Sequence, residues 1–374
     1  MSEKTKESAS TSSSSAGAEE PVPIVFIHGF KGAQLINTKT KCTEWVTAFQ
    51  TFGLSRIFYD LPITWKDPDT QDRDDIVVGD PLSYIAYFID IYGTLLSWGK
   101  RQGRPFHSYT WDWRRSPFEA VDGLRKLLEK IGRPCQLLCH SMGSLIGYVT
   151  VQKAYEEGGA ALAHRLVHSL LCVGPPFKPM EAYLAVTGSN VSSRRSSPRT
   201  AFTMPSSFVF IPVYGNDDKC GDPEYWVKHK IGAYLQSTGG KLTEQEMVHF
   251  RMCLDLTRRF QKLLLAPLPK GHPPIAILAS DTVNTGVSLD VENPDYDKPG
   301  MGPGDGTVPF ESAMGYPEGV NVIAVEKSTR DHVGLCKETQ KIEELLAKLL
   351  DYKNDKSEEV KEEEKEESDE KDEK

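Results

Sequence analysis

The fold is decided by the stretch Gln136-Leu137-Leu138-Cys139-His140-Ser141-Met142-Gly143-Ser144-Leu145-Ile146-Gly147. It begins as an apolar run of strand length, passes through a tight turn and continues as a helix start made of small residues. A serine at such a turn is held above the sheet, as in a nucleophile elbow. We therefore predict Ser141 as a nucleophile. A serine before a helix is also a common N-cap, and Cys139 stands where the motif usually has glycine, so other segments must support this assignment.

A glycine-containing loop near residue 30 offers the oxyanion hole that a serine nucleophile needs. The segment is Pro23-Ile24-Val25-Phe26-Ile27-His28-Gly29-Phe30-Lys31-Gly32, an early buried strand that opens into a loop. In enzymes with an elbow, this loop gives one backbone N–H and the residue after the nucleophile gives the other. We predict the N–H groups of Lys31 and Met142 as the donors, with Phe30 as the alternative to Lys31. A plain strand-to-loop turn would also explain the segment.

The supporting acid has two candidates. An acid that orients a histidine follows the nucleophile in the Ser, Asp, His chain order of this architecture. The segment Gly302-Pro303-Gly304-Asp305-Gly306-Thr307-Val308-Pro309 places one carboxylate among glycines, which lets the loop fold back under the site. Asp281 lies a few residues beyond the apolar run Ile275 to Leu278, where an acid is also expected. We favour Asp305 and keep Asp281 as the alternative.

The general base is predicted on a late loop, after the last strand and before the final helix. His332 has this position, in Ser328-Thr329-Arg330-Asp331-His332-Val333-Gly334-Leu335. Of the nine histidines, only His272 and His332 follow most of the predicted core, and His272 precedes both acid candidates. Ser141, Asp305 and His332 therefore form a candidate catalytic triad in the chain order of the α/β-hydrolases.

Short apolar runs bounded by loop residues predict strands that are buried on both faces. They are Ile24 to Ile27, Ser108 to Trp111, Gln136 to Cys139, Leu166 to Val173, Ile275 to Leu278 and Asn321 to Val325. Helical patterns lie between several of them, which favours a mostly parallel sheet covered by helices on both faces. The predicted fold class is α/β, with an α/β-hydrolase fold and an inserted cap.

Helix boundaries can be predicted at three places. Ser116, followed by a proline and a glutamate, predicts a helix that runs to about Ile131. Thr243 opens a second capping box, Thr-Glu-Gln-Glu. Between Ile342 and Leu350 the apolar residues recur at helical spacing, so the last helix is expected to lay one face on the sheet.

Composition divides the chain into a folded domain and two tails. Residues 1–21 are Ser-rich and are predicted to be disordered, and residues 22–352 form the hydrolase domain. A polar segment and a long helical pattern interrupt the alternation, so we place the cap at about 178–265. Residues 353–374 form an acidic tail, with twelve acidic and five basic residues from Asp355 onward, which accounts for most of the formal net charge of −9. The Gly- and Pro-rich stretch Asp281 to Pro303 is predicted as a long loop.

The sequence gives little support for a cofactor, a metal site, nucleic-acid binding or secretion. No phosphate-binding or dinucleotide-binding glycine motif and no paired histidine spacing for zinc is present, so we expect no cofactor and no metal. The charge pattern does not suggest nucleic-acid binding. The seven cysteines contain no Cys-x-x-Cys pair and are predicted to be reduced thiols in the core. Without an apolar leader or a membrane-length run, the expected compartment is the cytoplasm.

From about Val22 to Tyr352 the chain resembles the lecithin:cholesterol acyltransferase-like family of α/β-hydrolases. The motifs that carry the resemblance are His28 to Gly32, Trp111-Asp112-Trp113-Arg114, the elbow at Ser141, Val173-Gly174-Pro175-Pro176, Met204-Pro205-Ser206-Ser207, Gly304-Asp305-Gly306-Thr307-Val308-Pro309 and Asp331-His332. The Gly-Asp-Gly-Thr-Val-Pro segment is the most specific and favours Asp305 as the acid. The resemblance implies transfer or hydrolysis of the acyl groups of phospholipids and related glycerolipids.

The sequence departs from this family at three positions. Cys139 replaces the usual glycine, His28 stands where many members have proline, and Cys42 has no neighbouring cysteine for the lid disulfide of secreted members. The sterol acceptor of the secreted branch is therefore in doubt. The Trp111 segment itself is expected to combine core packing with an Arg–carboxylate pair, and a role in lining the acyl pocket is the alternative.

The expected activity is that of a serine-dependent lipid acyl hydrolase or O-acyltransferase of phospholipase type, which forms an acyl-serine intermediate. The expected partners are a lipid ester substrate and a membrane or other lipid surface. Phe30 and the cap residues Phe202, Met204 and Phe208 are predicted to contact substrate when the cap opens. The alternatives are a soluble carboxylesterase or thioesterase for small esters, and a non-catalytic lipid-binding homologue of the same fold.

Overall fold

A computed structural model describes residues 20–46, 61, 63, 74–86, 88–181, 183, 197–215, 219–291, 295 and 298–352. Both predicted tails, apart from residues 20 and 21, and part of the predicted cap lie outside these residues. The strands are β1 (Ile24–Ile27), β2 (Ala33–Asn37), β3 (Thr43–Trp45), β4 (Ile76–Pro81), β5 (Tyr84–Ile85), β6 (Ile89–Asp90), β7 (Phe106–Tyr109), β8 (Cys135–His140), β9 (Val167–Val173), β10 (Ile275–Ser280), β11 (Val283–Ser288), β12 (Gly300–Gly304) and β13 (Val322–Ser328). The helices are α2 (Gly93–Lys100), α3 (Pro117–Ile131), α4 (Met142–Leu166), α7 (Pro198–Thr203), α8 (Pro205–Phe208), α9 (Pro223–His229), α10 (Ala233–Ser237), α11 (Glu244–Leu264), α12 (Phe310–Ala313), the short 3₁₀ helix η1 (Gly334–Lys337) and α13 (Thr339–Asp351).

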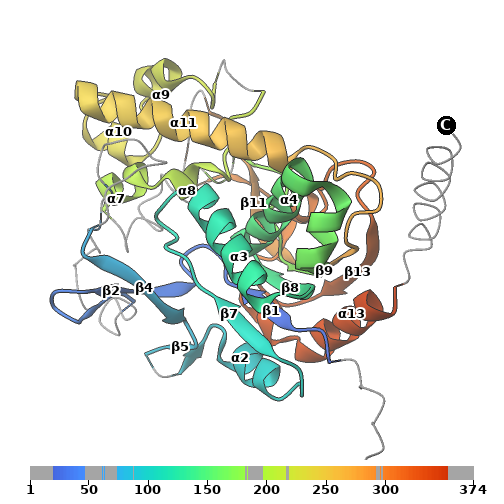
Figure 1. Cartoon of the computed structure of the whole chain (residues 1–374). Helices are drawn as coiled ribbons and strands as arrows, with labels where there is room; N and C mark the ends of the chain where they lie inside the picture. The colour runs from blue at the N-terminus through green and yellow to red at the C-terminus, as the bar shows by residue number, and fades with distance from the viewer. Residues whose placement is uncertain are drawn as a thin grey trace, which may run out of the picture.

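Six strands form one parallel sheet in the order β13-β10-β9-β8-β1-β7 (Figure 1). The registers of its central strands are fixed, with Ile27 opposite Cys139 and Cys139 opposite Cys172. Because all strands run the same way, their carboxyl ends meet at one edge, where ligands and catalytic groups gather in open α/β sheets. The elbow, the early glycine loop and the acid loop all lie at or near this edge.

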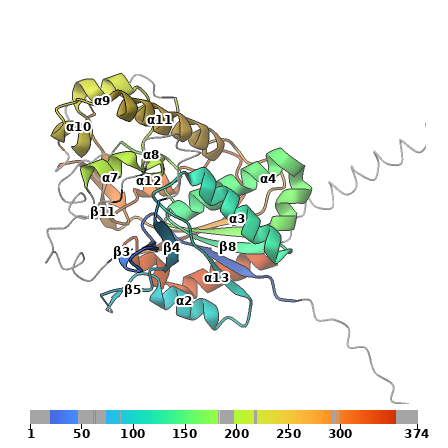
Figure 2. The same cartoon turned by 60° about the vertical axis from the view of Figure 1, so that its left-hand side comes forward.

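Helices cover both faces of this sheet. Because successive side chains of a strand point to opposite faces, alternate residues pack in different cores. Val25 and Ile27 of β1 pack in the core under α3 and α4, whereas Ile24 and Phe26 pack in the second core under α2 and α13. Figure 2 shows the two layers, with α3 and α4 on one side of β8 and with α2 and α13 on the other. The mostly parallel, helix-covered sheet predicted from the sequence is confirmed.

The predicted helix starts correspond to observed caps. Ser116 accepts a hydrogen bond from the Phe118 N–H at the start of α3, and α3 ends at Ile131. Thr243 and Glu246 form a capping box at the start of α11. In α13, Ile342, Leu345, Leu346 and Leu349 are buried against the sheet.

Two expectations about strands and loops were wrong. The outer strands β7 and β13 are only partly buried, because each has a strand neighbour on one side alone. The stretch Asp281 to Pro303 is not simply a long loop, since β11 and β12 pair as an antiparallel hairpin, with Asn284 opposite Pro303. Glycine and proline disfavour strands, and β12, Gly-Met-Gly-Pro-Gly, contains little else.

The described part of the region predicted as the cap, 178–265, contains α7 to α11 between β9 and β10. The long helix α11 packs on α8 and on α4, so this group of helices lies on the α4 side of the sheet (Figure 2). No helix of the described residues is long and apolar enough to cross a membrane. All seven cysteines are described and free, six of them are buried, and Cys42 is the exposed exception to the prediction of core thiols.

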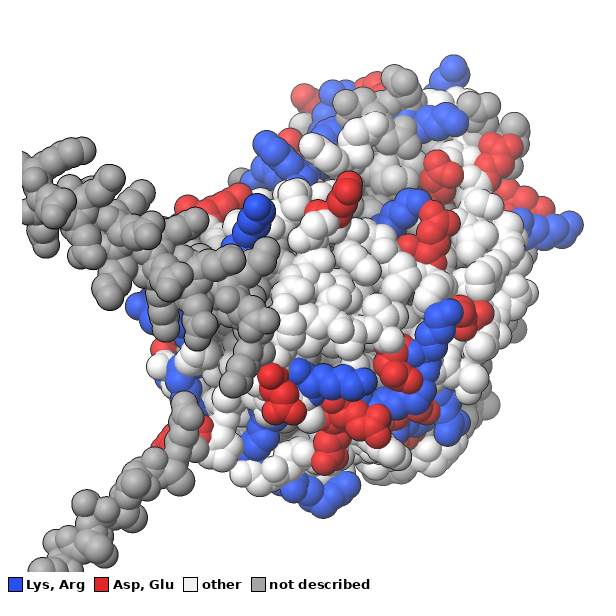
Figure 3. Space-filling view, turned by 90° about the vertical axis from the view of Figure 1, so that its right-hand side faces the viewer, with Lys and Arg blue, Asp and Glu red and all other residues white. Residues whose placement is uncertain are grey.

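The face over β13 and α13 carries interspersed charges of both signs (Figure 3). Several of them are paired, such as Lys341 with Glu326 and Arg330 with Glu338. An extended area of one sign, as a nucleic-acid surface would require, is not visible on this face.

Candidate active site

Ser141 lies in a strained turn between β8 and α4. Its backbone has φ 53° and ψ −125°, a region that residues with a side chain rarely adopt. The Ser141 N–H donates to the carbonyl oxygen of Val173 at 2.8 Å, and Ser144 N–H donates back to Ser141 O at 2.9 Å. Such strain persists only where the surroundings impose it, and it is typical of functional turns.

Two glycines, which have no side chain, allow the elbow to pack against the early glycine loop. A Cβ atom built on Gly29 would lie only 2.7 Å from the Ser141 Cβ, and one on Gly143 would collide with the Ile27 carbonyl. The departure at Cys139 also has a physical account. A Cβ on Gly147 would lie 2.9 Å from the Cys139 Sγ, so the glycine one helical turn into α4 leaves room for the thiol.

Asp305 and His332 form a buried pair. The His332 Nδ1 lies 2.7 Å from the Asp305 Oδ2, and the His332 N–H donates to the Asp305 carbonyl oxygen at 2.8 Å. The other carboxylate oxygen, Oδ1, accepts from the N–H groups of Thr307 and Val308 at 2.9 and 2.6 Å. Burial alone would raise the pKa of Asp305, but its electrostatic interaction and hydrogen bond with His332, together with these two amides, outweigh burial and lower the pKa.

Asp281, the alternative acid, occupies a different environment. Its carboxylate pairs with the Lys327 Nζ at 2.6 Å, and this hydrogen bond is the main cause of its lowered pKa. The structure therefore brings Asp305, and not Asp281, to His332.

The end of β9 joins the serine to this pair, which sequence reasoning did not assign to the site. Val173 accepts the Ser141 N–H, and the next residue, Gly174, has φ 58°. A Cβ atom on Gly174 would lie 3.1 Å from both the Asp305 Oδ2 and the His332 Nδ1. Glycine is therefore required here by backbone conformation and by space. The signal in the sequence is the Gly-Pro-Pro turn directly after a buried strand.

The early glycine loop makes a tight turn in which the Gly32 N–H donates to Gly29 O at 3.0 Å. Lys31 within it has φ 59°, and its carbonyl accepts from the Trp45 Nε1 at 3.0 Å. Met142 is the first residue of α4, where helix N–H groups have no partner four residues earlier. The assignment of the Lys31 and Met142 amides as oxyanion donors stays a prediction.

His28 anchors the start of that loop. Its ring stacks on Trp111 with an interplanar angle of 6°, and its Nε2 accepts from the Trp111 N–H at 3.2 Å. Burial lowers the pKa of His28 to about 4, so the ring is neutral at physiological pH. Farther along the same segment Arg114 pairs with Asp112 and Asp74, the combination of core packing and ion pairing expected for these residues.

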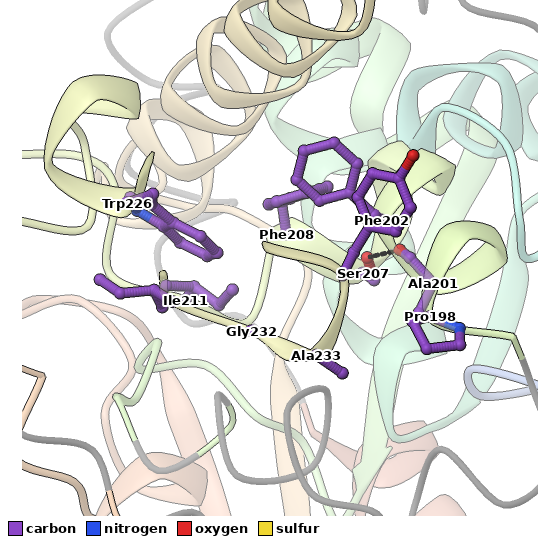
Figure 4. A pocket seen from close by; sticks show the side chains of 11 residues that line it. Pro198, Ala201, Phe202, Ser207, Phe208, Ile211, Trp226, Gly232 and Ala233 are labelled. Atoms are coloured by element: carbon purple, nitrogen blue, oxygen red, sulfur yellow. Dashed lines mark hydrogen bonds between the residues drawn. The ribbon is translucent and has the colours of Figure 1, made fainter. Parts of the chain in front are cut away.

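The residues predicted to contact substrate are largely buried. Phe202, Met204 and Phe208 are buried, and half-buried Phe30 contacts the rings of Trp113 and Phe210. Phe202 and Phe208 line a small apolar pocket (Figure 4). Its volume of about 30 Å³ is far below the several hundred Å³ of ordinary ligand sites, so in this conformation it holds no acyl chain. Contact of these side chains with substrate stays a prediction.

The buried histidines predict that the fold loses stability in acid. Burial lowers the pKa of His28 to about 4 and of His140 to about 3, whereas an unfolded histidine titrates near 6.5. Between these values the unfolded chain binds more protons, so the free energy of unfolding falls as pH falls, by up to about 1.4 kcal/mol per pH unit for each histidine.

Urea unfolding at pH 7, 6 and 5 measures this slope. The variant His140→Asn should reduce it, because it removes one of the two histidines whose lowered pKa gives rise to the slope. A free energy of unfolding that stays constant or rises from pH 7 to pH 5 would contradict the prediction.

The six-stranded parallel sheet, the elbow at Ser141 and the chain order of Ser141, Asp305 and His332 define an α/β-hydrolase. No family model matches the chain. It is similar to the proteins named lysosomal phospholipase A and acyltransferase from dog and mouse, each 24% identical over 255 residues, which cover 61% of this chain and 57% of the relative. The chain thus spans little more than half the length of these curated relatives. At the level of distant homology, the resemblance to the lecithin:cholesterol acyltransferase-like family is confirmed.

Among solved structures, the chain is similar to one in a crystal structure described as the Tle4–Tli4 complex, with a TM-score of 0.49, 12% identity and coverage of 86% of this chain and 96% of that one. It is also similar to the mature lipase BlEst2 of Bacillus licheniformis, with a TM-score of 0.37, 11% identity and coverage of 88% and 96%. The assignment of the fold rests on the sheet and the elbow themselves.

Proposed function

We propose that this chain is a serine-dependent lipid acyl hydrolase and O-acyltransferase of phospholipase type, acting on phospholipid or glycerolipid esters. His332 takes the proton of the Ser141 hydroxyl, whose oxygen attacks the ester carbonyl carbon. The Lys31 and Met142 amides stabilise the oxyanion, and Asp305 holds the imidazole and stabilises its charged form. The alcohol leaves with a proton from His332. Water or an acceptor alcohol, deprotonated by His332, then releases the acyl group from Ser141.

One observation carries the proposal: the buried hydrogen bond of 2.7 Å between Asp305 and His332. This pair packs against Gly174, and the residue before Gly174 accepts a hydrogen bond from the backbone of Ser141 in its strained elbow. A serine that served only as an N-cap would need neither the strain nor the pair. The lipid class is supported by the distant homology with proteins named phospholipase A and acyltransferase.

Labelling with a fluorophosphonate probe, followed by mapping of the modified residue, tests the proposal. We expect one modified serine, Ser141, and no label on Ser141→Ala. Ser144→Ala is the matched control, because Ser144 is a buried serine in the first turn of α4 whose hydroxyl donates to Cys139 O at 3.2 Å. Absence of label on the wild-type protein would favour the non-catalytic lipid-binding alternative. Label at Ser141 with turnover of small esters alone would favour a carboxylesterase or thioesterase.

A further prediction concerns the acyl acceptor. Water is far more concentrated than any alcohol, so a transferase must hold its acceptor beside the acyl-serine and exclude water. Cys42 is a free, exposed thiol, so no disulfide fixes a lid at that position. We therefore expect hydrolysis to exceed transfer in a purified assay.

The measurement uses vesicles of a phospholipid labelled in its acyl chain, with and without a long-chain alcohol, a sterol or a diacylglycerol. Free fatty acid is compared with acylated acceptor. If acylated acceptor exceeds free acid whenever an acceptor is present, the protein is an acyltransferase first and the expected order is wrong.

We also propose a cytoplasmic location with peripheral contact at lipid surfaces. The seven free thiols support a reducing compartment. The test is microscopy of the tagged full chain: a lysosomal signal, in keeping with the name of the relatives, would refute this location.

A further inference from the structure

A buried line of hydrogen bonds runs from the oxyanion loop to the loop of the general base through two residues that the mechanism does not use. The Gly29 N–H donates to the Tyr92 hydroxyl at 3.1 Å. The same hydroxyl lies 2.8 Å from the Nδ1 of His140, and the Nε2 of His140 lies 3.1 Å from the carbonyl oxygen of His332. Tyr92 and His140 are only 2% and 4% exposed.

The chemistry of the groups fixes the direction of every bond in this line. The His332 carbonyl can only accept, so the His140 Nε2 carries a proton. Burial and the neighbouring His332 lower the pKa of His140 to about 3, so its ring is neutral and its Nδ1 is an acceptor. The Tyr92 hydroxyl must then donate to Nδ1, which leaves its oxygen free to accept the Gly29 N–H. The Tyr92 hydroxyl and the His140 ring thus each donate one hydrogen bond and accept one.

Each end of the line lies on a part of the candidate site that must be placed accurately. Gly29 is held at its N–H by Tyr92, while its carbonyl accepts from the Gly32 N–H and lies 2.7 Å from the His28 Nδ1. At the other end, the ring of His140 lies with its centroid 4.7 Å from that of His332. His140 is also the residue directly before Ser141, so a shift of either loop is transmitted to the nucleophile.

We propose that Tyr92 and His140 are positioning residues that hold the oxyanion loop and the His332 loop in register around Ser141. The inference rests on the proposed function, because positioning has a kinetic meaning only if Ser141 reacts. Neither residue touches the reacting atoms. Their loss is expected to act on the transition state, in which the base and the oxyanion donors must be placed together, more than on substrate binding.

Three variants cut the line at different points. Tyr92→Phe keeps the ring, which packs edge-on against Phe26, and removes the hydroxyl that serves both neighbours. His140→Asn can keep an acceptor at the position of Nδ1 for Tyr92 and loses the bond to the His332 carbonyl. His140→Gln can keep that donor and loses the acceptor for Tyr92. The control is Tyr148→Phe, because Tyr148 is a buried tyrosine of α4 whose hydroxyl donates to Ala266 O at 2.9 Å, away from both loops.

We expect Tyr92→Phe to lower kcat for ester hydrolysis by about 10- to 100-fold with KM changed less than about threefold, because misplacement by an ångström costs about that much in rate. The rate of fluorophosphonate labelling should fall in parallel. His140→Asn and His140→Gln should each lower kcat. Tyr148→Phe should leave kcat unchanged, even if it lowers the unfolding temperature as much as Tyr92→Phe does. Equal kcat values for Tyr92→Phe and Tyr148→Phe, or a loss that appears only in KM, would overturn the proposal.

A measurement on the unmodified protein does not depend on how the variants fold. Histidine ¹⁵N NMR at pH 7 and pH 5 should find His140 neutral with its proton on Nε2, and His28, whose Nε2 accepts from Trp111, with its proton on Nδ1. A proton on His140 Nδ1 at pH 7, or a charged ring at pH 5, refutes the line. Absence of probe labelling on the wild-type chain would instead reject the proposed function, which this NMR measurement leaves untouched.

Discussion

Replacement of Ser141 by alanine is expected to lower acyl hydrolysis by about 10⁴- to 10⁶-fold and to leave the fold intact, the range found when a triad nucleophile is removed. Alanine removes the hydroxyl and keeps the Cβ atom, which is the part of Ser141 that lies against Gly29, so the packing of the elbow is expected to be unchanged. His332→Ala should cause a similar loss, since the serine and the base act as one unit. The measurement is kcat/KM on phospholipid vesicles and on a soluble ester.

Ser144→Ala provides the control for this result, and circular dichroism shows whether each variant is folded. Near-native turnover of Ser141→Ala on every ester tested would remove the basis for the whole site. A large loss in Ser144→Ala as well would indicate that the turn, and not the Ser141 hydroxyl, had been tested.

Replacement of Asp305 by asparagine is expected to lower kcat by about 10⁴-fold at neutral pH, the effect of a histidine held in the wrong tautomer. The structure says why asparagine would do this. The N–H groups of Thr307 and Val308 both point at the Asp305 Oδ1, so the amide oxygen of asparagine must face them. Its NH₂ group then faces the His332 Nδ1 and donates to it, which moves the ring proton to Nε2. That nitrogen can no longer accept the proton of Ser141.

Asp281→Asn is the comparison for this variant and should change kcat less than about threefold, because its partner is the surface residue Lys327. Both kcat values are measured on the same substrate over a range of pH. If Asp281→Asn caused the larger loss, the acid would have to be reassigned to Asp281.

The sequence was sufficient for the parts of the molecule in which local pattern and fold agree. The buried runs of β1, β8, β9 and β10 and the caps at Ser116 and Thr243 follow from periodicity and capping chemistry alone. The candidate triad was accessible because the Ser, Asp, His chain order restricts which late residues can meet Ser141. Chain order alone could not choose between Asp305 and Asp281, because both follow β10; the glycine-rich segment favoured Asp305, and the contact with His332 agrees with that choice.

Features that depend on contacts between distant segments could not be predicted. Strand β12 consists almost entirely of glycine and proline, against their propensity, and it forms because it pairs with β11 in a hairpin that leads directly into Asp305. Gly174 belongs to the site through the space it leaves for His332. The hydrogen bonds of the line from Gly29 through Tyr92 and His140 to His332 span between 48 and 192 positions of the chain, and no motif marks Tyr92.

The thiol of Cys139 beside Gly147 has an evolutionary consequence. Alanine at 147 would place a methyl group 2.9 Å from the sulfur. Glycine at 139 would remove a fully buried side chain, and we expect it to leave a small void. Because the two positions are in contact, we expect their substitutions to be coupled, with the pair costing less free energy of unfolding than the sum of the single changes. We therefore expect a change between cysteine and glycine in the elbow to be better tolerated when residue 147 changes with it.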